Sequence, residues 1–431
     1  MENIAEVLQA IFIGTVVAKF LLITNRVVKA IELCKECLIL VKNLKIPNNE
    51  KDCVRLVIYT TMSMGYTLIS DHTNGIECIR KLLTLLCECG DRVTEARTTM
   101  HLAILYERQS NYKKAKEIYE KALMIWTEIG ERQEQGSCYE HMGTLCMSLG
   151  DYVLAKEHLQ KAVAISKEIG DRQREAANYR DLGTVFLCLA EYDQAKECFQ
   201  KALVIRNEIG DRQGEAIDYG KLGSVCLSLA KYDQAKENLL KALAIRKEIG
   251  DRQAEAVDYG NLGTVFRCLG EYDKAKEYLQ KALAISKEIE FREGEAAAYV
   301  NFGTVFISLA EYGKAEEYLQ KALVISKETG DKKVEACCYA SLGTIFETYG
   351  EYYKAKQYYE KSLVLSKEIS HRQGEAASYG NLGAIFLTVG EHFKAEEYFK
   401  RALVISEISG DKEGEATQYA RLGNEFGSRA W

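Results

Sequence analysis

The chain has 431 residues, of which 47% are apolar and 28% are charged, and its net charge is −6. This balance excludes an intrinsically disordered chain, and the acidic sum argues against a nucleic-acid or membrane partner, because both need a basic surface. The length predicts two or three globular domains unless the fold is a repeat array, which grows without one large core.

The first 49 residues lie outside the clearly repeated pattern and predict a divergent helical cap over residues 1–49. Residues 11–23 are almost wholly apolar, and Lys19 interrupts them. This stretch is shorter than the ~20 residues that a membrane-spanning helix needs, and no signal peptide is evident. We therefore expect an apolar helix packed inside the N-terminal end. Pro47 is the only proline of the sequence, so little else interrupts helices.

The 14 cysteines follow no spacing that predicts disulfides or a metal site. Cys34 and Cys37 form a Cys-x-x-Cys pair, but on an apolar helix without the strand–helix–strand context of a redox motif, so we expect buried packing. Most other cysteines replace Ala, Phe, Leu or Ser of neighbouring repeats, as Cys226 replaces Phe186. Small buried thiols of this kind predict a reducing, cytoplasmic location.

A seven-residue segment recurs at intervals of 40 residues along the rest of the chain. It reads Gly-Asp-Arg-Gln-Gly-Glu-Ala from Gly210, and similar segments start at Gly170 and Gly250. Altered copies start at Gly90, Gly130, Glu290, Gly330, Ser370 and Gly410. The register predicts a degenerate repeat over residues 50–89, eight full repeats over 90–409 and a terminal half repeat over 410–431.

Each repeat has the pattern of two amphipathic helices, helix A and helix B. In the repeat that starts at Gly210, Asp211 is a good N-cap for helix A, which we expect to end near Ser228. Helix B is predicted over about residues 232–249, and Gly250 ends it in the left-handed conformation that glycine favours. The repeated pattern therefore predicts an all-α chain.

Two ladders of small residues predict close contact between helix A and helix B. Glycine inside a helix costs about 1 kcal/mol relative to alanine, so its repetition at one position needs a packing reason. The helix A ladder is Gly143, Gly183, Gly223, Gly263, Gly303, Gly343, Gly383 and Gly423. The facing helix B ladder is Ala115, Ala155, Ala195, Ala235, Ala275, Ala315, Ala355 and Ala395.

The repeat resembles the tetratricopeptide repeat (TPR). The matching positions of one unit are Tyr259, Leu262, Gly263, Phe266, Tyr272, Ala275, Leu279 and Ala282. The resemblance implies a TPR-like all-α fold, a right-handed superhelical solenoid of antiparallel helix pairs. It also implies that helix A lines a concave groove. The family's carboxylate clamp needs Lys and Asn where this unit has Gly260 and Thr264, which argues against binding of chaperone tails.

The period of 40 residues, the lack of a proline after helix B and the Gly-Asp-Arg opening resemble the repeats of Pins-type G-protein-signalling modulators. Those proteins are adaptors whose repeats hold extended partner peptides in the inner groove. They have short Gα-binding motifs after the repeats, and this sequence has no such tail, so the G-protein role does not carry over.

By the same resemblance, the groove positions that differ among repeats are the candidate partner-binding residues. They are Arg97, His101, His141, Arg180, Lys221, Asn261, Arg267, Asn301 and Asn381. The N-terminal half of this set is charged, and we expect Arg97 and Arg180 to hold carboxylates of a partner. An ordinary solvated helix face is the alternative. His101 and His141 are one repeat apart, about 8–10 Å between helices, which is too far for shared zinc ligands.

No pattern in the sequence predicts catalysis, a cofactor or a metal. The sequence has neither a Gly-rich phosphate loop nor a Ser/His/Asp arrangement. We therefore expect a non-catalytic scaffold or adaptor in signalling that binds a protein or peptide segment. The alternative is a structural or self-associating repeat module of a larger or truncated protein. The end at Trp431 favours truncation, because solenoids normally end in a polar cap.

Overall fold

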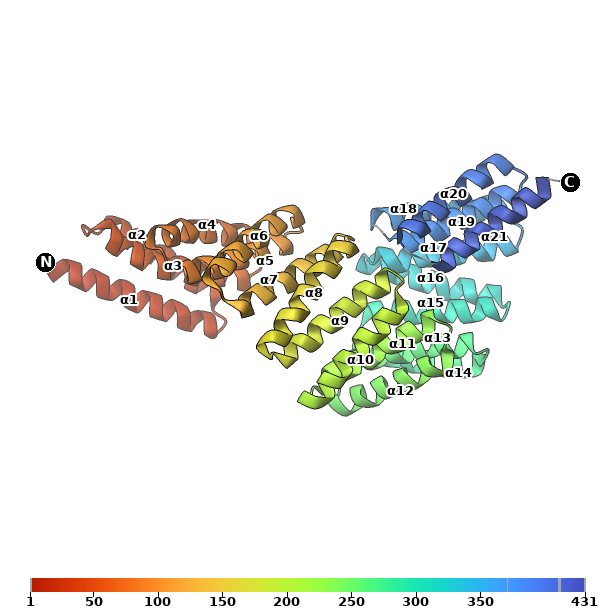
Figure 1. Cartoon of the computed structure of the whole chain (residues 1–431), viewed down its shortest axis with the longest axis horizontal. Helices are drawn as coiled ribbons and strands as arrows, with labels where there is room; N and C mark the ends of the chain where they lie inside the picture. Colours follow the sequence, from red (N-terminus) through yellow and green to blue (C-terminus); the bar gives the residue numbers. More distant parts are fainter. Residues whose placement is uncertain (1, 370, 410–411, 430–431) are drawn as a thin grey trace. The chain divides into compact units, whose positions relative to one another are not determined.

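The computed structural model describes residues 2–369, 371–409 and 412–429, which form 21 α-helices and no β-strand (Figure 1). The helices are α1 (Glu2–Ile23), α2 (Val27–Asn43), α3 (Asn48–Leu68), α4 (His72–Cys89), α5 (Arg92–Arg108), α6 (Tyr112–Ile129), α7 (Arg132–Ser148), α8 (Tyr152–Ile169), α9 (Arg172–Cys188), α10 (Tyr192–Ile209), α11 (Arg212–Ser228), α12 (Tyr232–Ile249), α13 (Arg252–Cys268), α14 (Tyr272–Glu288), α15 (Arg292–Ser308), α16 (Tyr312–Thr329), α17 (Lys332–Thr348), α18 (Tyr352–Glu368), α19 (Arg372–Thr388), α20 (His392–Ser409) and α21 (Lys412–Arg429). The prediction of an all-α solenoid of antiparallel helix pairs is confirmed.

Odd-numbered helices are the A helices and even-numbered helices are the B helices of successive pairs. Within each unit, an A helix packs against the B helices that precede and follow it in that unit. The chain divides into two compact units, residues 1–171 with α1–α8 and residues 172–431 with α9–α21. In the second unit one hydrophobic core runs without interruption from Cys226 to Ile345. The continuous core is what makes each repeat depend on its neighbours.

The turns between helices have the predicted chemistry. Asp211 caps α11 by accepting a hydrogen bond from the Gly214 amide at 2.8 Å, and Gly250 ends α12 with a φ of 73°. Turns from helix A to helix B also need a left-handed residue, which is Ala230 after α11 and Gly270 after α13. The predicted repeat openings at Ser370 and Gly410 lie outside the described residues.

At the ladder glycines from Gly143 to Gly383, a side chain of helix B leaves no room for a Cβ atom, as the sequence predicts. Gly423 contradicts the prediction, because nothing lies within 4 Å of its Cβ position. A Cβ atom added at Gly263 would lie 2.6 Å from Leu279 Cδ2 and 2.7 Å from Leu279 Cγ. In other repeats the residue at the position of Leu279 also faces the glycine, and it is either Leu or an aromatic residue, such as Phe199 at Gly183. Because these neighbours are fully buried, the packing leaves them little room to move.

The Arg of the repeated Gly-Asp-Arg opening forms ion pairs that join the start of helix A to the end of helix B in the same repeat. Arg252, at the start of α13, bonds Glu255 at 2.7 Å and Glu288, at the end of α14, at 2.6 Å. The equivalent bridges to the end of helix B are Arg92–Glu128, Arg132–Glu168, Arg172–Glu208, Arg212–Glu248, Arg292–Glu328 and Lys332–Glu368. These exposed pairs contribute at most about 1 kcal/mol each, so they mainly fix the register of the pair.

Helix α1 contradicts the prediction that the N-terminal apolar stretch is packed inside. Phe12 is 69% exposed and Phe20 is 62% exposed. Among the described residues α1 packs against α2 and α3, so one of its faces has neighbours and the other has none. The apolar stretch is also longer than the predicted residues 11–23. The apolar segment of α1 is Ile4–Ile23, which is long and apolar enough to cross a membrane by length and composition alone, and 17% of the residues in its most apolar window are buried.

Candidate partner-binding face

The A helices from α13 to α21 form the inner side of their part of the second unit. From α13 to α21 each A helix contacts the next A helix as well as its B helices. Helices on the inner side of a curved stack are closer together than those outside, so this contact places the A helices on the concave side. The inner face therefore consists of A-helix positions that repeat every 40 residues.

One of these positions forms a half-buried polar ladder along the second unit. Its members are Asp181, Lys221, Asn261, Asn301, Ser341, Asn381 and Arg421. Beside the ladder, small residues leave room for the side chains of the next repeat. The Asn301 amide nitrogen lies 3.7 Å from where a Cβ of Gly260 would stand, and Arg421 lies against Gly380 in the same way. We name this row of seven residues the inner ladder.

Three of the predicted site residues lie in the first unit. Arg97 is exposed on α5, as a residue that meets a partner must be. His101 is half-buried, 3.5 Å from the Thr67 hydroxyl, and burial lowers its pKa, with Arg108 adding to the effect. His141 stacks on the ring of Tyr119 with ring centres 5.6 Å apart. The two histidines therefore have separate neighbours.

The other predicted residues lie in the second unit, and most belong to the inner ladder or border it. Arg180 contacts the neighbouring ladder residue Asp181, with Nε and Oδ1 3.1 Å apart, so its charge is already partly compensated. Lys221, Asn261, Asn301 and Asn381 are members of the ladder. Arg267 lies at the end of α13, where its guanidinium contacts the Cys268 sulfur at 3.5 Å.

Two buried Arg–Asp pairs between repeats were not predicted. Arg206 on α10 lies 3.8 Å from Asp218 on α11, and Arg246 on α12 lies 3.2 Å from Asp258 on α13. Burial raises the pKa of each aspartate to about 7, although the neighbouring arginine acts in the opposite direction. A signal for these pairs is present in the sequence. Arg206 and Arg246 stand at the repeat position that holds Ser286 in another repeat, and each is followed 12 residues later by an Asp.

The cysteine and metal predictions concern other parts of the chain. Cys34 is fully buried and Cys37 is 3% exposed, where the Cys37 sulfur packs against Gly14 of α1. The buried-packing prediction for this pair is confirmed, and burial raises the pKa of Cys34 to about 12. The described residues contain no group of three His, Cys, Asp or Glu side chains placed to hold a metal ion.

The chain belongs to the tetratricopeptide repeat family. That family's model matches residues 134–208, 214–288, 294–368 and 349–408, which together span more than half of the chain. The prediction of a TPR protein is thereby confirmed, and proteins of this family typically serve as protein-interaction scaffolds. A second model, soluble NSF attachment protein (SNAP), matches residues 61–168. No curated protein sequence matches the chain.

Solved structures with the same fold include the apo form of RapI and aspartyl phosphate phosphatase F from Bacillus subtilis. RapI is 16% identical to this chain, with a TM-score of 0.57, and the match covers 64% of this chain and 99% of the RapI chain. Phosphatase F is 18% identical to this chain, with a TM-score of 0.55, and the match covers 82% of this chain and 93% of the phosphatase F chain. At these identities the similarity is one of fold.

Proposed function

We propose that this chain is a non-catalytic adaptor that binds an extended segment of a partner protein along the inner ladder. The observation on which this rests is the ladder itself, in which hydrogen-bonding side chains recur at one half-buried position of successive A helices. These positions differ among repeats, whereas the packing ladders are nearly constant, as expected for a surface that recognises a ligand.

The spacing of the ladder suits an extended peptide. Packed helices lie about 8–10 Å apart, and an extended chain rises about 3.3 Å per residue, so one rung falls beside every third peptide residue. Asn side chains offer one acceptor and two donors, which matches the C=O and N–H groups of a peptide backbone. Asn261, Asn301 and Asn381 would therefore hold the backbone without selecting its sequence.

Sequence selection would come from basic residues on the A helices of each unit. In the second unit, Lys221 adds a positive charge to the ladder, and Arg180 can bind a partner carboxylate with two hydrogen bonds once it leaves Asp181. In the first unit, Arg97 would select in the same way, whereas the lowered pKa of His101 favours its neutral imidazole. Membership of the Pins-type subgroup, a role in signalling and a cytoplasmic location belong to this proposal and rest on the sequence pattern.

Self-association is the second candidate function, and the exposed apolar face of α1 favours it. Phe12, Val16 and Phe20 are each at least half exposed on this face. Apolar surfaces of this kind are typical of association sites. Sedimentation velocity on the wild type and on a Phe12→Ser, Phe20→Ser variant tests it. A concentration-dependent dimer that the variant abolishes supports self-association, whereas a monomer at all concentrations contradicts it.

Peptide display tests the adaptor function without a known partner. Peptides selected on the wild-type chain from a random library are counter-screened on an Asn261→Ala, Asn301→Ala, Asn381→Ala variant. We expect most selected peptides to lose binding on this variant. The matched control is Gln200→Ala, Gln280→Ala, Gln320→Ala, which removes three exposed amides from the B helices. Equal retention of peptides by both variants would place the binding face elsewhere.

A further inference from the structure

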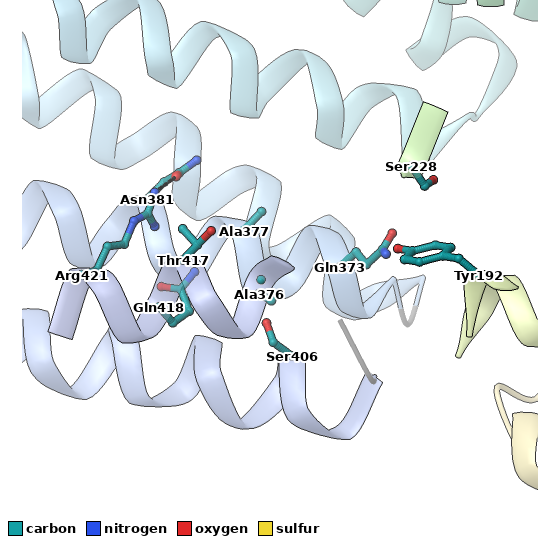
Figure 2. Close-up of a pocket in the computed structure, with 11 residues that line it drawn as sticks. Tyr192, Ser228, Gln373, Ala376, Ala377, Asn381, Ser406, Thr417, Gln418 and Arg421 are labelled. Atoms are coloured by element: carbon teal, nitrogen blue, oxygen red, sulfur yellow. Dashed lines mark hydrogen bonds between the residues drawn. The ribbon is translucent and has the colours of Figure 1, made fainter. Parts of the chain in front are cut away.

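Two cavities of the chain differ in the helices that line them. The polar cavity around Arg421, between α19 and α21, belongs to the inner face and to the proposed groove (Figure 2). The other cavity lies in the first unit, has a volume of about 520 Å³ and is lined by α2, α3 and α4. Six of its eight lining residues come from the B helices α2 and α4, so it is separate from the inner ladder, which lies on A helices.

This second cavity, which we call the outer pocket because most of its lining comes from B helices, combines basic and apolar side chains. Its lining residues are Leu38, Ile39, Lys42, Arg55, Tyr59, Lys81, Thr84 and Leu85. Three of them are basic and none is acidic, although the chain as a whole has a net charge of −6. The side chain of Ile39 is apolar and yet 61% exposed. A pocket of this composition fits a ligand that has both an anionic and an apolar part.

Part of the positive charge of the outer pocket comes from a reversed ion pair at the start of α3. Five other repeats begin helix A with an Arg that bonds a Glu three residues later, as Arg252 bonds Glu255. In those repeats the Glu is buried, and Glu255 is 5% exposed. The corresponding residues of the degenerate repeat are Asp52 and Arg55, whose charged atoms lie 2.8 Å apart. The second position therefore has a guanidinium in this repeat, where the other repeats have a buried carboxylate.

The three basic side chains of the outer pocket keep hydrogen-bond donors for a ligand. Arg55 uses Nη1 to bond Asp52, which leaves its Nε and Nη2 groups for another acceptor. Lys81 uses one of its three donors for Glu77, in an exposed pair. Lys42 is exposed and has no ion pair in the part of the chain that the structure describes. An anion in the pocket could therefore bond all three cations, which is stronger than a single exposed pair.

We propose that the outer pocket binds a small acidic amphiphile, in which a phosphate or carboxylate group is joined to an alkyl or acyl chain. The anionic group would bind the three basic side chains, and the chain would lie against Leu38, Ile39 and Leu85. The volume falls within the range of about 300–1,000 Å³ that small-molecule pockets have, which favours such a ligand over a protein segment. The inference does not depend on the proposed adaptor function, because the inner ladder lies in the second unit.

Octyl phosphate is the probe, and titration calorimetry measures its binding to the full chain below the concentration at which it forms micelles. Two comparison compounds each lack one part of it. Octyl glucoside has the same chain without the charge, and inorganic phosphate has the charge without the chain. We expect octyl phosphate to bind at least about tenfold more tightly than either compound, because the pocket contacts both parts.

Vesicles distinguish the two sources of an acidic amphiphile. The full chain is titrated with phosphatidylcholine vesicles that either contain or lack phosphatidic acid. Binding of octyl phosphate without binding of the acidic vesicles identifies a free amphiphile as the ligand. Binding of octyl phosphate and of the acidic vesicles, but not of the neutral vesicles, identifies a lipid of a bilayer.

Reversal of the ion pair at the start of α3 locates the site. The double variant Asp52→Arg, Arg55→Glu has the pair that Arg252 and Glu255 form, keeps the net charge and places a carboxylate in the pocket. Glu88 stands at the end of α4, where other repeats have the second partner of the arginine, so the fold should tolerate the change. We expect octyl phosphate to bind this variant at least about tenfold more weakly, with an unchanged unfolding midpoint by circular dichroism.

Two single changes at exposed residues complete the set. Lys42→Gln should weaken the binding of octyl phosphate roughly twofold to fivefold. Ile39→Ser should weaken it by a similar factor and leave the binding of inorganic phosphate unchanged, because it removes only apolar contact. Lys29→Gln is the matched control, since Lys29 is an exposed lysine of the same helix outside the pocket.

Three outcomes overturn the assignment. One is that octyl phosphate binds no more tightly than octyl glucoside or inorganic phosphate. The second is that the reversed variant, folded as the wild type is, binds octyl phosphate with unchanged affinity. If that variant does not fold, unchanged affinity of both Lys42→Gln and Ile39→Ser has the same meaning. The third is tighter binding of an acidic apolar peptide, acetyl-leucyl-glutamyl-leucine amide, than of octyl phosphate, which would point to a protein ligand.

Discussion

The packing of helix A on helix B predicts the effect of a single methyl group at Gly263. In an open helix, Gly→Ala stabilises by about 0.5–1 kcal/mol because alanine loses less entropy on folding. At Gly263 the added Cβ would stand 2.7 Å from Leu279 Cγ and 3.4 Å from the Ala275 carbonyl oxygen. A clash near the base of a buried side chain costs about 1–3 kcal/mol. Subtracting the gain from the cost gives an expected net destabilisation of about 0–2.5 kcal/mol relative to wild type.

The chain provides a matched control for this substitution. Gly313, near the start of α16, has nothing within 4 Å of the Cβ position, so Gly313→Ala should leave stability unchanged or raise it slightly. Urea unfolding followed by circular dichroism measures both variants, and hydrogen exchange reports local opening of α13 and α14. A Gly263→Ala variant as stable as Gly313→Ala would refute the close-contact explanation of the ladder.

The clash is specific to Leu279, which allows a second test of the same reasoning. Leu279→Ala alone should cost about 2–5 kcal/mol, because it empties a fully buried site. Adding Gly263→Ala to this variant should cost nothing further, since the opposing side chain is gone. The two changes are therefore expected to be non-additive, and simple additivity would show that Leu279 is not what the methyl group meets.

Two further predictions follow from burial. Burial raises the pKa of Asp218 and Asp258 from the ordinary value of 3.8 to about 7. As pH rises from about 4 to 7, the unfolded chain loses these protons while the folded chain keeps them, so the free energy of unfolding falls over this range. Asp218→Asn removes this titration, so the variant should gain roughly 1–4 kcal/mol of unfolding free energy relative to wild type as pH rises from 4 to 7. A difference between the two proteins that stays constant over this pH range would contradict the raised pKa of Asp218. Thiol labelling of the native chain should modify exposed Cys53 and Cys89 and spare Cys34 and Cys138, whose pKa burial raises to about 12. Rapid labelling of all four would show that the core around Cys34 and Cys138 opens readily.

The repeat made most of the fold predictable from sequence, because its determinants are local. Asp211, Gly250 and Gly263 each act within one repeat, and the 40-residue register copies them along the chain. The prediction for α1 failed because apolar composition indicates burial only where a neighbouring element exists to cover it. Phe12 and Phe20 have no such neighbour in the described structure.

The candidate site was predictable only in part, because it depends on contacts between repeats. The inner-ladder residues Asn261 and Asn301 could be listed from the register, but the compensation of Arg180 by Asp181 could not. The pocket at Arg421 depends on the path of the stack, which brings Tyr192 near Gln373 from 181 positions earlier in the sequence. No local pattern predicts a contact at that separation.

The central claim, that the inner ladder holds a partner segment, is tested most directly by titration calorimetry with a display-selected peptide. Removing the three amides of Asn261, Asn301 and Asn381 should weaken binding by about tenfold to a thousandfold, at roughly 0.5–1.5 kcal/mol per hydrogen bond. The matched variant without Gln200, Gln280 and Gln320 should bind as the wild type does. Equal affinity of the ladder variant and the wild type would contradict the account.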